Sequence, residues 1–498
     1  MRWLEEKLFS YGMPEEALME KVGLRMKDWF MKSTEFLNEG VLVLVGPGHN
    51  GGDGLVLARE LYLAGVDVAL WCPLPIKKSL TAKYLSYCIS IGIIQLQNEP
   101  DAFDKAIWIE ALFGIGQNRP IPQEIGALLR SREEIRPGRL ISLDVPAGIC
   151  SEKGIPFENG AAKAAVTLTV GLIKEGLLQD IALPHVGTLT RIDIGIPKVL
   201  FHILPKKTPL KISSKDIQSF ALPAIPQNAS KYERGRLFVI SGSKKYKGAS
   251  LLALKGAIAS GVGSVQAVLP ENISSALFGI VPEVIFHEYP FQKNDEICLA
   301  KCLENMNLDR IDSLLIGPGL GSSNENWDQV CIALEDFSGL LVLDADGLNR
   351  LSSSNEGWKW LRKRKGITWI TPHKNEFARL FPDIDLSSPL KAAVMAAELS
   401  GAGVLIKGAH SVIASPDGSV WQLANTSHVV ARTGLGDLLA GFIAGIGALG
   451  MCSKNKLNFE LFALGVLIHA YAARKCEEGS NADSIAKKLA IVMKRLQR

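Results

Sequence analysis

Two runs of short, uniformly apolar segments, each alternating with helical patterns, restrict this chain to a narrow set of folds. The first run predicts strands at Val41–Val45, Val66–Leu70, Ile93–Leu96, Ala106–Ile109, Leu140–Val145, Ala165–Val170 and Arg191–Ile194. The second run predicts strands at Leu237–Ser241, Ser264–Leu269, Ser313–Ile316, Leu340–Asp344, Thr368–Thr371 and Val404–Lys407. Strands that are apolar throughout are buried on both faces, which is typical of a parallel sheet covered by helices on each side. The sequence therefore predicts an α/β protein with two such sheets.

A proline-rich segment separates the two runs. Five prolines occur from Pro197 to Pro226, and proline at this density is unfavourable inside a helix or a central strand. The chain has 498 residues, which is enough for two or three domains of about 100–200 residues each. We therefore predict domains at residues 1–205 and 229–498, with residues 206–228 as a linker or as a crossover along a sheet edge.

Composition excludes several classes of protein. The 55 Lys and Arg residues against 51 Asp and Glu give a net charge of +4, which is too dilute over this length for a nucleic-acid-binding stripe. Eight cysteines without a CxxC pair do not make a disulfide framework in so long a chain, so we expect a reducing, cytoplasmic compartment. The longest uncharged apolar stretch, Leu438–Cys452, is shorter than the ~20 residues that span a bilayer, so no membrane partner is expected.

The first apolar strand runs directly into a glycine-rich segment, GPGHNGGDG at Gly46–Gly54. Its five glycines predict a turn with positive φ angles that lets the backbone approach a ligand closely. A helix is predicted to follow over Gly54–Ala64, and its free N–H groups suit a phosphate or a diphosphate. The segment is neither a GxGxxG fingerprint with its later acidic residue nor a phosphate-binding loop ending in Gly-Lys-Ser/Thr.

Two further segments place carboxylates at the ends of predicted strands. The segments IEALFGIGQNRP and ISLDVPAGI carry Glu110 and Asp144. Because the carboxyl ends of neighbouring parallel strands line one crevice, we expect these carboxylates to lie near Asn50 and Asp53 of the glycine-rich segment. Oxygen atoms of this kind suit a hard cation or proton transfer.

These segments, together with Tyr11–Gly23 and Val166–Pro197, resemble the N-terminal NAD(P)HX epimerase domain of the bifunctional NAD(P)H-hydrate repair enzymes. The resemblance implies a Rossmann-like three-layer αβα sandwich. It also implies that the domain interconverts the R and S epimers of NAD(P)H hydrated at C6 (NAD(P)HX), with a K⁺ ion near the substrate.

Carried over position by position, this resemblance implies three roles. Substrate contacts would come from His49, Asn50, Gly51, Gly52, Asp53, Gly114, Ile115, Gly116, Gln117, Asn118, Arg119, Pro120 and Asp144. The K⁺ ligands would be Asn50, Glu110 and Ala147, and Asp144 would be the catalytic residue. His49, Glu110 and Ala147 stand where the family has Asn, Asp and Ser.

In the second half of the chain, polar or glycine-rich motifs again follow the predicted strands. In chain order these are a Gly-Ala-Ser helix start, a PGLG turn, Asp344 and Asp346 of DADGLN, His373 of TPH, Lys407 of IKG, and Asp437 of GLGD. Asp437 falls in the first turn of a helix predicted over Gly434–Leu449. A helix N-terminus stabilises phosphate oxygens and developing negative charge, and Asp437 is the natural general acid or base there.

This order of motifs resembles the ribokinase-like fold and, within it, the ADP-dependent NAD(P)H-hydrate dehydratase domain. The resemblance implies a second αβα domain, in which a nucleotide drives the loss of water from S-NAD(P)HX to regenerate NAD(P)H. It implies substrate contacts from Ala249, Gly319 and His373, and adenine-nucleotide contacts from Lys407, Gly408, Ala409, His410, Ser411 and Gly436. Asp437 would lie between the two ligands and take the hydroxyl proton, with ADP as co-substrate and Mg²⁺ as its metal ion.

Two other functions stay open at this point. A ribokinase-like domain also suits a small-molecule kinase for a vitamin precursor. Alternatively, the N-terminal domain is a degenerate ligand-binding or assembly module, which the departures at His49, Glu110 and Ala147 motivate. The sequence does not decide whether the nucleotide is ADP or ATP, or whether NADHX or NADPHX is the preferred substrate. We expect small-molecule ligands and a homo-oligomer.

Overall fold

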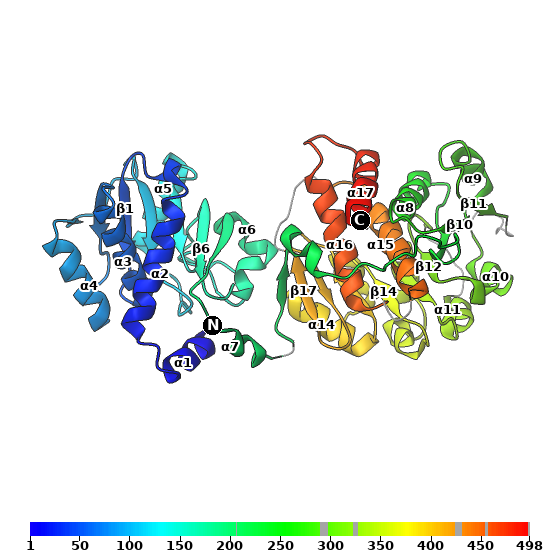
Figure 1. Cartoon of the computed structure of the whole chain (residues 1–498), viewed down its shortest axis with the longest axis horizontal. Coiled ribbons are helices and arrows are strands. Elements are labelled where there is room, and N and C mark those ends of the chain that lie inside the picture. Colours follow the sequence, from blue (N-terminus) through cyan, green and yellow to red (C-terminus); the bar gives the residue numbers. More distant parts are fainter. Residues whose placement is uncertain (206, 289–296, 322–326, 424–430, 454–456, 497–498) are drawn as a thin grey trace. The chain divides into compact units, whose positions relative to one another are not determined.

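The computed structural model of the chain describes residues 1–205, 207–288, 297–321, 327–423, 431–453 and 457–496. These residues form two compact units, Met1–Leu204 and Pro205–Arg498 (Figure 1). Within the predicted linker, Leu210–Ile212 is strand β8 of the second unit, and residue 206 lies outside the described residues. The domain bounds of 1–205 and 229–498 stay a prediction.

The first unit contains a seven-stranded sheet in which every described strand pair is parallel. The strands are β1 (Val41–Val45), β2 (Val68–Trp71), β3 (Ile94–Leu96), β4 (Ile107–Ala111), β5 (Leu140–Leu143), β6 (Val166–Val170) and β7 (Thr188–Ile192). Their order across the sheet is β3-β2-β1-β4-β5-β6-β7, which confirms the predicted parallel sheet. The order reverses between β1 and β4, so the loops that follow these two strands diverge and leave a crevice at the carboxyl edge.

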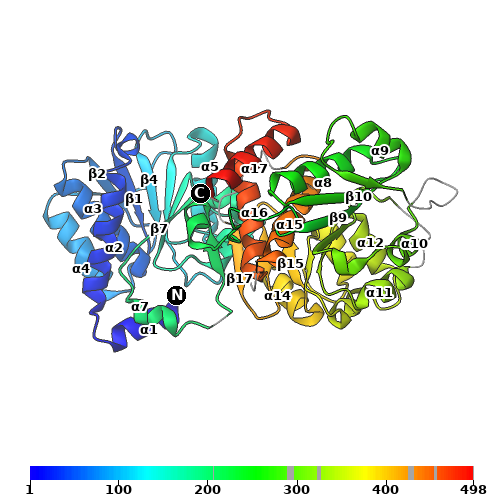
Figure 2. The same cartoon turned by 45° about the vertical axis from the view of Figure 1, so that its right-hand side comes forward.

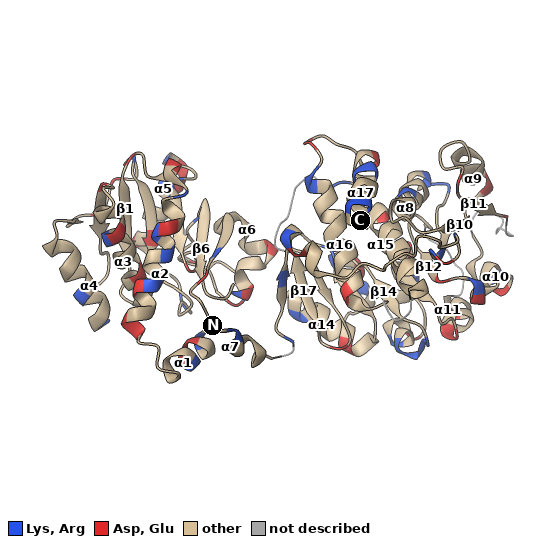
Figure 3. Cartoon of the chain, in the orientation of Figure 1, with Lys and Arg blue, Asp and Glu red and all other residues tan. Residues whose placement is uncertain are grey.

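Helices cover both faces of this sheet, which confirms the predicted three-layer arrangement. One face packs against α1 (Arg2–Ser10), α2 (Glu15–Phe30), α3 (His49–Leu63) and α4 (Ser79–Ser90), and the other against α5 (Gln123–Ile135). The short helices α6 (Leu183–Val186) and α7 (Lys198–His202) precede and follow β7. Helix α2 buries Leu18, Val22 and Met26 on one side and carries charges of both signs elsewhere (Figure 3), as expected for an amphipathic surface helix.

The glycine-rich segment after β1 is helical rather than a loop with positive φ angles. Helix α3 begins at His49, and none of the five glycines in Gly46–Gly54 adopts a positive φ, so that prediction is wrong. The glycines are needed for close packing instead. A Cβ atom on Gly46 would lie 1.8 Å from the carbonyl oxygen of Leu112, and one on Gly51 would lie 2.1 Å from that of Gly46. The absence of side chains lets the first turn of α3 sit directly on the strand ends.

The second unit contains a ten-stranded, largely parallel sheet with the order β11-β10-β9-β12-β13-β14-β15-β16-β17-β8. Its strands are β9 (Arg236–Ile240), β10 (Ser264–Val268), β11 (Ile285–His287), β12 (Ser313–Ile316), β13 (Leu340–Leu343), β14 (Thr368–Ile370), β15 (Gly403–Ile406), β16 (Val412–Ala414) and β17 (Val420–Leu423). Strand β16 is antiparallel to both of its neighbours, β15 and β17, and β8 pairs with β17 in parallel at the edge.

This second sheet also lies between two helical layers (Figure 2). One layer contains α8 (Lys247–Ala259), α9 (Glu271–Leu277), α15 (Leu435–Cys452), α16 (Phe459–Arg474) and α17 (Ala482–Leu496). The other contains α10 (Leu299–Glu304), α11 (Trp327–Glu335), α12 (Asp346–Ser352), α13 (Lys374–Leu380) and α14 (Pro389–Ser400). The predicted helix over Asn324–Phe337 begins outside the described residues, and its described part is α11.

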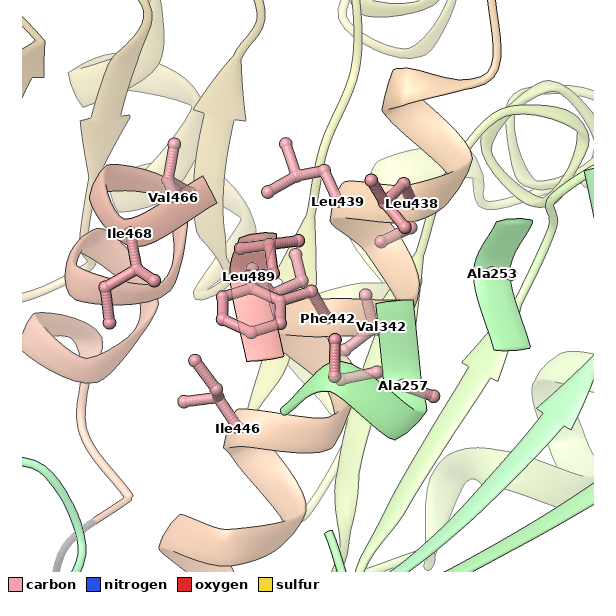
Figure 4. Packing of buried hydrophobic residues seen from close by; sticks show 14 of the residues in the cluster. Ala253, Ala257, Val342, Leu438, Leu439, Phe442, Ile446, Val466, Ile468 and Leu489 are labelled. Atoms are coloured by element: carbon pink, nitrogen blue, oxygen red, sulfur yellow. The ribbon is translucent and has the colours of Figure 1, made fainter. Parts of the chain in front are cut away.

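Helix α15 is the central helix of the second unit's core. Phe442 and Ile446 of this helix pack with Val342 of β13 and Leu489 of α17 (Figure 4). Its length and composition would suit a membrane span, but 78% of it is buried inside the unit. A Cβ atom on Gly441 would lie 1.8 Å from the carbonyl oxygen of Ala253 in α8. This close helix–helix packing fixes the N-terminal turn of α15, which carries Asp437.

Candidate active sites

A large cavity opens at the carboxyl edge of the first unit's sheet. Its volume is about 1290 Å³, and its wall comes from the loops after β1, β2, β4 and β5, from the end of β6, and from helices α1 and α2. Most of the predicted substrate contacts line it, namely His49, Asn50, Asp53, Gly114, Ile115, Gly116, Gln117, Asn118, Arg119, Pro120 and Asp144. Gly51 and Gly52 are buried in the first turn of α3 and are not among the lining residues, so their contact with substrate stays a prediction.

Asp144 and Lys174 form a buried ion pair beside this cavity. The Asp144 carboxylate also accepts from the backbone N–H groups of Val170 (3.2 Å) and Ile115 (3.3 Å). The Lys174 ammonium further donates to Thr169 Oγ1 (3.1 Å) and to the Val170 carbonyl (2.8 Å). Asp144 has a φ of +65°, which is costly for a residue other than glycine and persists only where its surroundings fix it. The carboxylate is therefore held in one orientation by two neighbouring loops.

Two more carboxyl groups line the same cavity, Asp53 of α3 and Glu5 of α1. Burial raises the pKa of Asp53 well above its ordinary value, and the charges of Asp144 and Glu5 add to the effect. Burial also raises the pKa of Glu5, with the charge of Asp144 as the second cause. The carboxylate of Asp144 is thus paired with an ammonium group, whereas burial favours the protonated form of Asp53. Unequal environments of this kind give one proton acceptor and one proton donor in the same site.

Two side-chain amides at the cavity have polar atoms without a hydrogen-bond partner among the described residues. Asn50 donates from Nδ2 to the carbonyls of Phe113 (3.0 Å) and Leu143 (3.2 Å), but its buried Oδ1 has no partner. Both polar atoms of the Gln117 amide are likewise buried and unpartnered. Because buried polar atoms are nearly always hydrogen-bonded, these atoms are suited to contacts with a ligand.

The structure brings two of the three predicted K⁺ ligands into contact. Glu110 accepts from the backbone N–H of Ala147 (2.9 Å) and from that of Leu112 (3.3 Å). Glu110 is fully buried, and burial raises its pKa to about 8. No hydrogen bond joins either residue to Asn50 within the part of the chain that the structure describes. The Ala147 side chain lies in the apolar cluster around Trp108, so the family's serine hydroxyl would face the core there.

Sequence reasoning missed Lys174 and the contribution of α1. Lys174 lies just past the carboxyl end of β6, so the rule that located Asp144 and Glu110 also points to it. Helix α1 is different, because it precedes the sheet and no strand end marks it. Its Arg2 donates to the Ile115 carbonyl (3.2 Å), and Glu5 lines the cavity. Only the folded chain places this helix beside the strand ends.

At the carboxyl edge of the second sheet, the Lys407 ammonium lies among carboxylates. Its Nζ is 2.7 Å from Oδ1 of Asp344 and 4.0 Å from Oε2 of Glu376. Asp344 follows β13 and also accepts from Thr371 Oγ1 at 2.7 Å. Burial lowers the pKa of Lys407, but Asp344 and Glu376 outweigh that effect and raise it. The ammonium therefore stays charged and compensates these carboxylates.

Asp437 faces the same group of charges from the first turn of α15. Burial raises its pKa to about 7; the charge of Asp344 adds to this and that of Lys407 opposes it. The adjacent Gly436 is also close, since a Cβ atom there would lie 3.6 Å from the Lys407 ammonium nitrogen. A carboxyl group whose pKa lies near neutrality is well matched to general acid–base catalysis.

His373 and Glu376 cap helix α13 together. The Nδ1 atom of His373 accepts from the N–H groups of Asn375 (3.1 Å) and Glu376 (3.2 Å), and Glu376 Oε2 accepts from the N–H of His373 (2.8 Å). The His373 side chain is 49% exposed and the Glu376 side chain only 7%. His373 can therefore contact a ligand while it caps the helix, and Glu376 is held facing inward.

The other two predicted substrate contacts of the second unit, Gly319 and Ala249, lie side by side. Gly319 has a φ of +64°, and a Cβ atom there would lie 2.7 Å from the Cβ of Ala249. Among the predicted nucleotide contacts, Ser411 Oγ donates to the Gly408 carbonyl (2.9 Å) and closes a turn directly after Lys407. His410 lies buried within that turn, and Ala409 beside it is half-buried.

Comparison with known families covers both units. Residues 237–495 match the family model described as NAD(P)H-hydrate dehydratase. Residues 15–176 match the family model described as YjeF-related protein N-terminus. The two matches lie on different units of the structure.

Individual relatives match along nearly the whole length. A bifunctional NAD(P)H-hydrate repair enzyme from Gloeobacter violaceus is 37% identical over 97% of this chain and 94% of its own. A protein of the same description from Synechocystis sp. is 37% identical over 90% of this chain and 84% of its own. A solved NAD(P)H-hydrate dehydratase from Bacillus subtilis aligns with 58% of this chain and 98% of its own, at 23% identity and a TM-score of 0.48.

Proposed function

The chain belongs to the family of bifunctional NAD(P)H-hydrate repair enzymes, and on that premise we propose that it carries two separate active sites. The first, in residues 1–205, epimerises R- and S-NAD(P)HX. The second, in residues 229–498, uses ADP to convert S-NAD(P)HX to NAD(P)H and releases AMP and phosphate. The observation that carries this assignment is the 37% identity over 97% of the chain. In support, each unit has a carboxylate–lysine pair at the carboxyl edge of its sheet.

The two alternatives drawn from the sequence explain less. A small-molecule kinase would not account for the first unit, which matches a family model of its own. A degenerate first unit would not account for a cavity of about 1290 Å³ beside a strained, ion-paired Asp144. Strain and buried charge cost stability, and they are retained where they serve a site.

In the epimerase, Asp144 is the residue that moves the proton of the C6 hydroxyl. Inversion at C6 requires a bond to that carbon to break and re-form. Loss of the hydroxyl proton lets the C6–N1 bond break to an aldehyde while N1 takes up a proton. N1 then re-adds to the other face of the carbonyl, gives up that proton, and the oxygen regains one. The ion pair with Lys174 orients the Asp144 carboxylate toward the cavity-lining loop at Ile115. Asp53, whose protonated form is favoured by burial, supplies the donor on the same wall. Positioned acid–base pairs of this kind typically contribute about 10²–10⁴-fold in rate.

The residues present fit a K⁺ ion near this site. Asn50 offers a buried Oδ1 without a partner among the described residues, and Glu110 offers a buried carboxyl whose pKa is raised to about 8 by burial. We assign the ion to these two side chains and to the backbone carbonyl of Ala147. The ion would stabilise negative charge near the substrate and would favour the ionised form of Glu110.

In the dehydratase, Asp437 takes the proton of the C6 hydroxyl as that oxygen attacks the terminal phosphoryl group of ADP. The phosphorylated oxygen is then a good leaving group, and loss of phosphate with a proton from C5 restores the double bond of NAD(P)H. The N-terminal turn of α15 and Gly436 lie beside Lys407, where they stabilise the transferring phosphoryl group. The pKa of about 7 suits Asp437 to this task at neutral pH.

The second site also fits a divalent cation. The charges of Asp344, Asp346 and Glu376 raise the pKa of Asp437, and that of Lys407 lowers it, so among these groups carboxyls outnumber the ammonium. Oxygen ligands of this kind suit Mg²⁺, which would bind together with the nucleotide phosphates and neutralise their charge. We further place the chain in the cytoplasm, as small-molecule ligands and a nucleotide co-substrate suggest, and propose that it forms a homo-oligomer.

Purified single epimers test the two assignments separately. The full chain is incubated with R-NADHX alone, and S-NADHX is followed by chromatography. In parallel, S-NADHX is supplied with Mg²⁺ and either ADP or ATP, and NADH is followed by its absorbance. We expect nucleotide-independent interconversion in the first assay and nucleotide-dependent NADH formation in the second. Phosphorylation of a vitamin precursor without NADH formation would instead favour the kinase.

A further inference from the structure

The wall of the epimerase cavity carries two lysines that the mechanism does not use. The loop after β2 ends in Lys77 and Lys78, and both residues line the cavity. Both are exposed, and neither forms an ion pair among the residues that the structure describes. Two positively charged side chains thus stand on the wall of a ligand-sized space, outside the ion pairs that its carboxylates form.

The position of these lysines is fixed relative to the glycine-rich segment. The backbone N–H of Lys77 donates to the carbonyl of Pro47 (2.9 Å), and Thr81 Oγ1 donates to the carbonyl of Gly48 (3.0 Å). These two bonds fasten the start of α4 to the turn after β1. Lys77 and Lys78 therefore stand beside that turn.

The order of strands places the lysines at the opposite end of the cavity from Asp144. Asp144 follows β5 and the lysines follow β2, with β1 and β4 between these two strands. Three strand spacings of about 4.8 Å separate β2 from β5, which is roughly 14 Å. A dinucleotide whose nicotinamide end is at Asp144 and whose diphosphate is at the turn after β1 directs its adenosine ribose toward β2.

The charge of the loop that follows β2 selects between two forms of that ribose. In dinucleotide-binding α/β sheets, an acidic residue near the end of the second strand binds the ribose 2′-hydroxyl, whereas a basic residue accommodates a 2′-phosphate. This chain has no Asp or Glu between Asp67 and Glu99, and Lys77 and Lys78 lie in that interval.

We infer that Lys77 and Lys78 bind the 2′-phosphate and make the epimerase site prefer NADPHX over NADHX. The two lysines are thus specificity-determining residues for the reaction proposed above, and the inference rests on that proposed function. Because two exposed ammonium groups hold the 2′-phosphate, we expect the site to bind NADPHX about tenfold more tightly than NADHX.

The test compares K77A, K78A and K77A/K78A with K83A in the full chain. Lys83 lies on α4, the helix that directly follows the two lysines. It pairs with Glu16 and is not part of the cavity wall, so K83A removes a positive charge nearby. The quantity measured is kcat/KM for epimerisation of R-NADPHX and of R-NADHX without nucleotide. Dehydration of S-NADHX by the same preparations serves as the folding control.

We expect the ratio of kcat/KM for NADPHX to that for NADHX to fall about tenfold in K77A/K78A and less than about twofold in K83A. An unchanged ratio in the double variant, or an equal fall in K83A, would overturn the inference. Dissociation constants of NADP⁺ and NAD⁺ from the same variants give a readout without turnover. If the unmodified chain epimerises neither substrate, the proposed function fails, and the change in the ratio of these two constants still decides the role of the lysines.

Discussion

The ammonium nitrogen of Lys407 lies 2.7 Å from Oδ1 of Asp344, within a group of carboxyls that also acts on Asp437. The family motif assigns Lys407 to the nucleotide, but its protein contacts in the structure are with carboxylates. Lys407 therefore lowers the pKa of Asp437, the proposed base of the dehydratase, whether or not it also reaches a phosphate. The opposing charges explain how one small site holds several carboxyls.

Replacing Lys407 by Met is expected to move the pH dependence of dehydration to higher pH. The charge of Lys407 lowers the pKa of Asp437, and the base must be ionised to act. We expect the ascending limb of the pH profile of kcat/KM for S-NADHX to shift to higher pH in K407M. We also expect the folded protein to lose about 3 kcal/mol of stability, because Asp344 stays buried without its ammonium partner. A lower rate with an unmoved limb would mean that Lys407 serves only to bind a ligand.

Replacing Asp437 by Asn is expected to stabilise the folded protein at high pH only. Folding raises the pKa of Asp437 from 3.8 to about 7, so ionisation between these values favours the unfolded chain. Stability that is present below pH 4 is therefore lost as the pH rises toward 7. We predict a higher melting temperature for D437N than for the unmodified chain at pH 8 and equal values at pH 4. A difference of the same size at both pH values would exclude a titrating Asp437.

Breaking the Asp144–Lys174 pair is expected to cost both stability and epimerisation. Each residue is buried with the other as its charge partner, so D144N or K174M leaves one buried charge uncompensated, at about 3 kcal/mol. The double variant should cost less than the sum of the single variants because the two sites are coupled. Chemical denaturation measures the stability, and R-to-S conversion measures the activity. Additive costs would show that the pair does not interact.

Two neighbouring glycines in the first unit provide a matched test of packing. A Cβ atom on Gly51 would lie 2.1 Å from the Gly46 carbonyl oxygen, whereas one on Gly48 meets nothing within 4 Å. We predict that G51A loses about 1–3 kcal/mol and most epimerase activity, because α3 must move away from the strand ends. G48A should lose only about 0.5–1 kcal/mol, the cost of alanine at the N-cap of α3, and should keep its epimerase activity. Equal behaviour of the two variants in thermal unfolding would refute the packing explanation.

Removal of potassium is expected to act on the first unit alone. If K⁺ binds at Asn50 and Glu110, its addition should speed epimerisation and raise the melting temperature of that unit. The variant N50A should lose both responses while dehydration of S-NADHX is unchanged. Calorimetry in potassium and in lithium salts makes the comparison, and an undiminished potassium response in N50A would place the ion elsewhere.

The strands and their parallel packing were predictable because uniformly apolar strands are buried on both faces. The strand ends placed Asp144 and Glu110 at the carboxyl edge of the first sheet, and a predicted helix start placed Asp437 in the first turn of α15. Family motifs added the remaining residues of the loops. The glycine-rich segment was misjudged, because φ angles depend on packing partners such as Leu112 that sequence spacing does not reveal. Glycine there serves close packing of a helix on strand ends, which composition alone does not distinguish from a loop.

Side-chain direction was the second limit. Nothing in the motif around Lys407 states that its ammonium turns toward Asp344, because that depends on the register of β13, β14 and β15. Helix α1 joins the cavity through tertiary packing and leaves no local signal in Arg2 or Glu5. Such contacts between segments distant in sequence are what the folded structure adds.

The most direct test of two separate active sites is the recovery of NADH from mixed R- and S-NADHX with ADP and Mg²⁺. The unmodified chain should convert essentially all of the hydrate, D144N should stop near half and continue only at the spontaneous rate, and D437N should form no NADH. If D144N converts the whole mixture as fast as the unmodified chain does, the cavity of the first unit is not the epimerase site. The account of two sites would then be wrong.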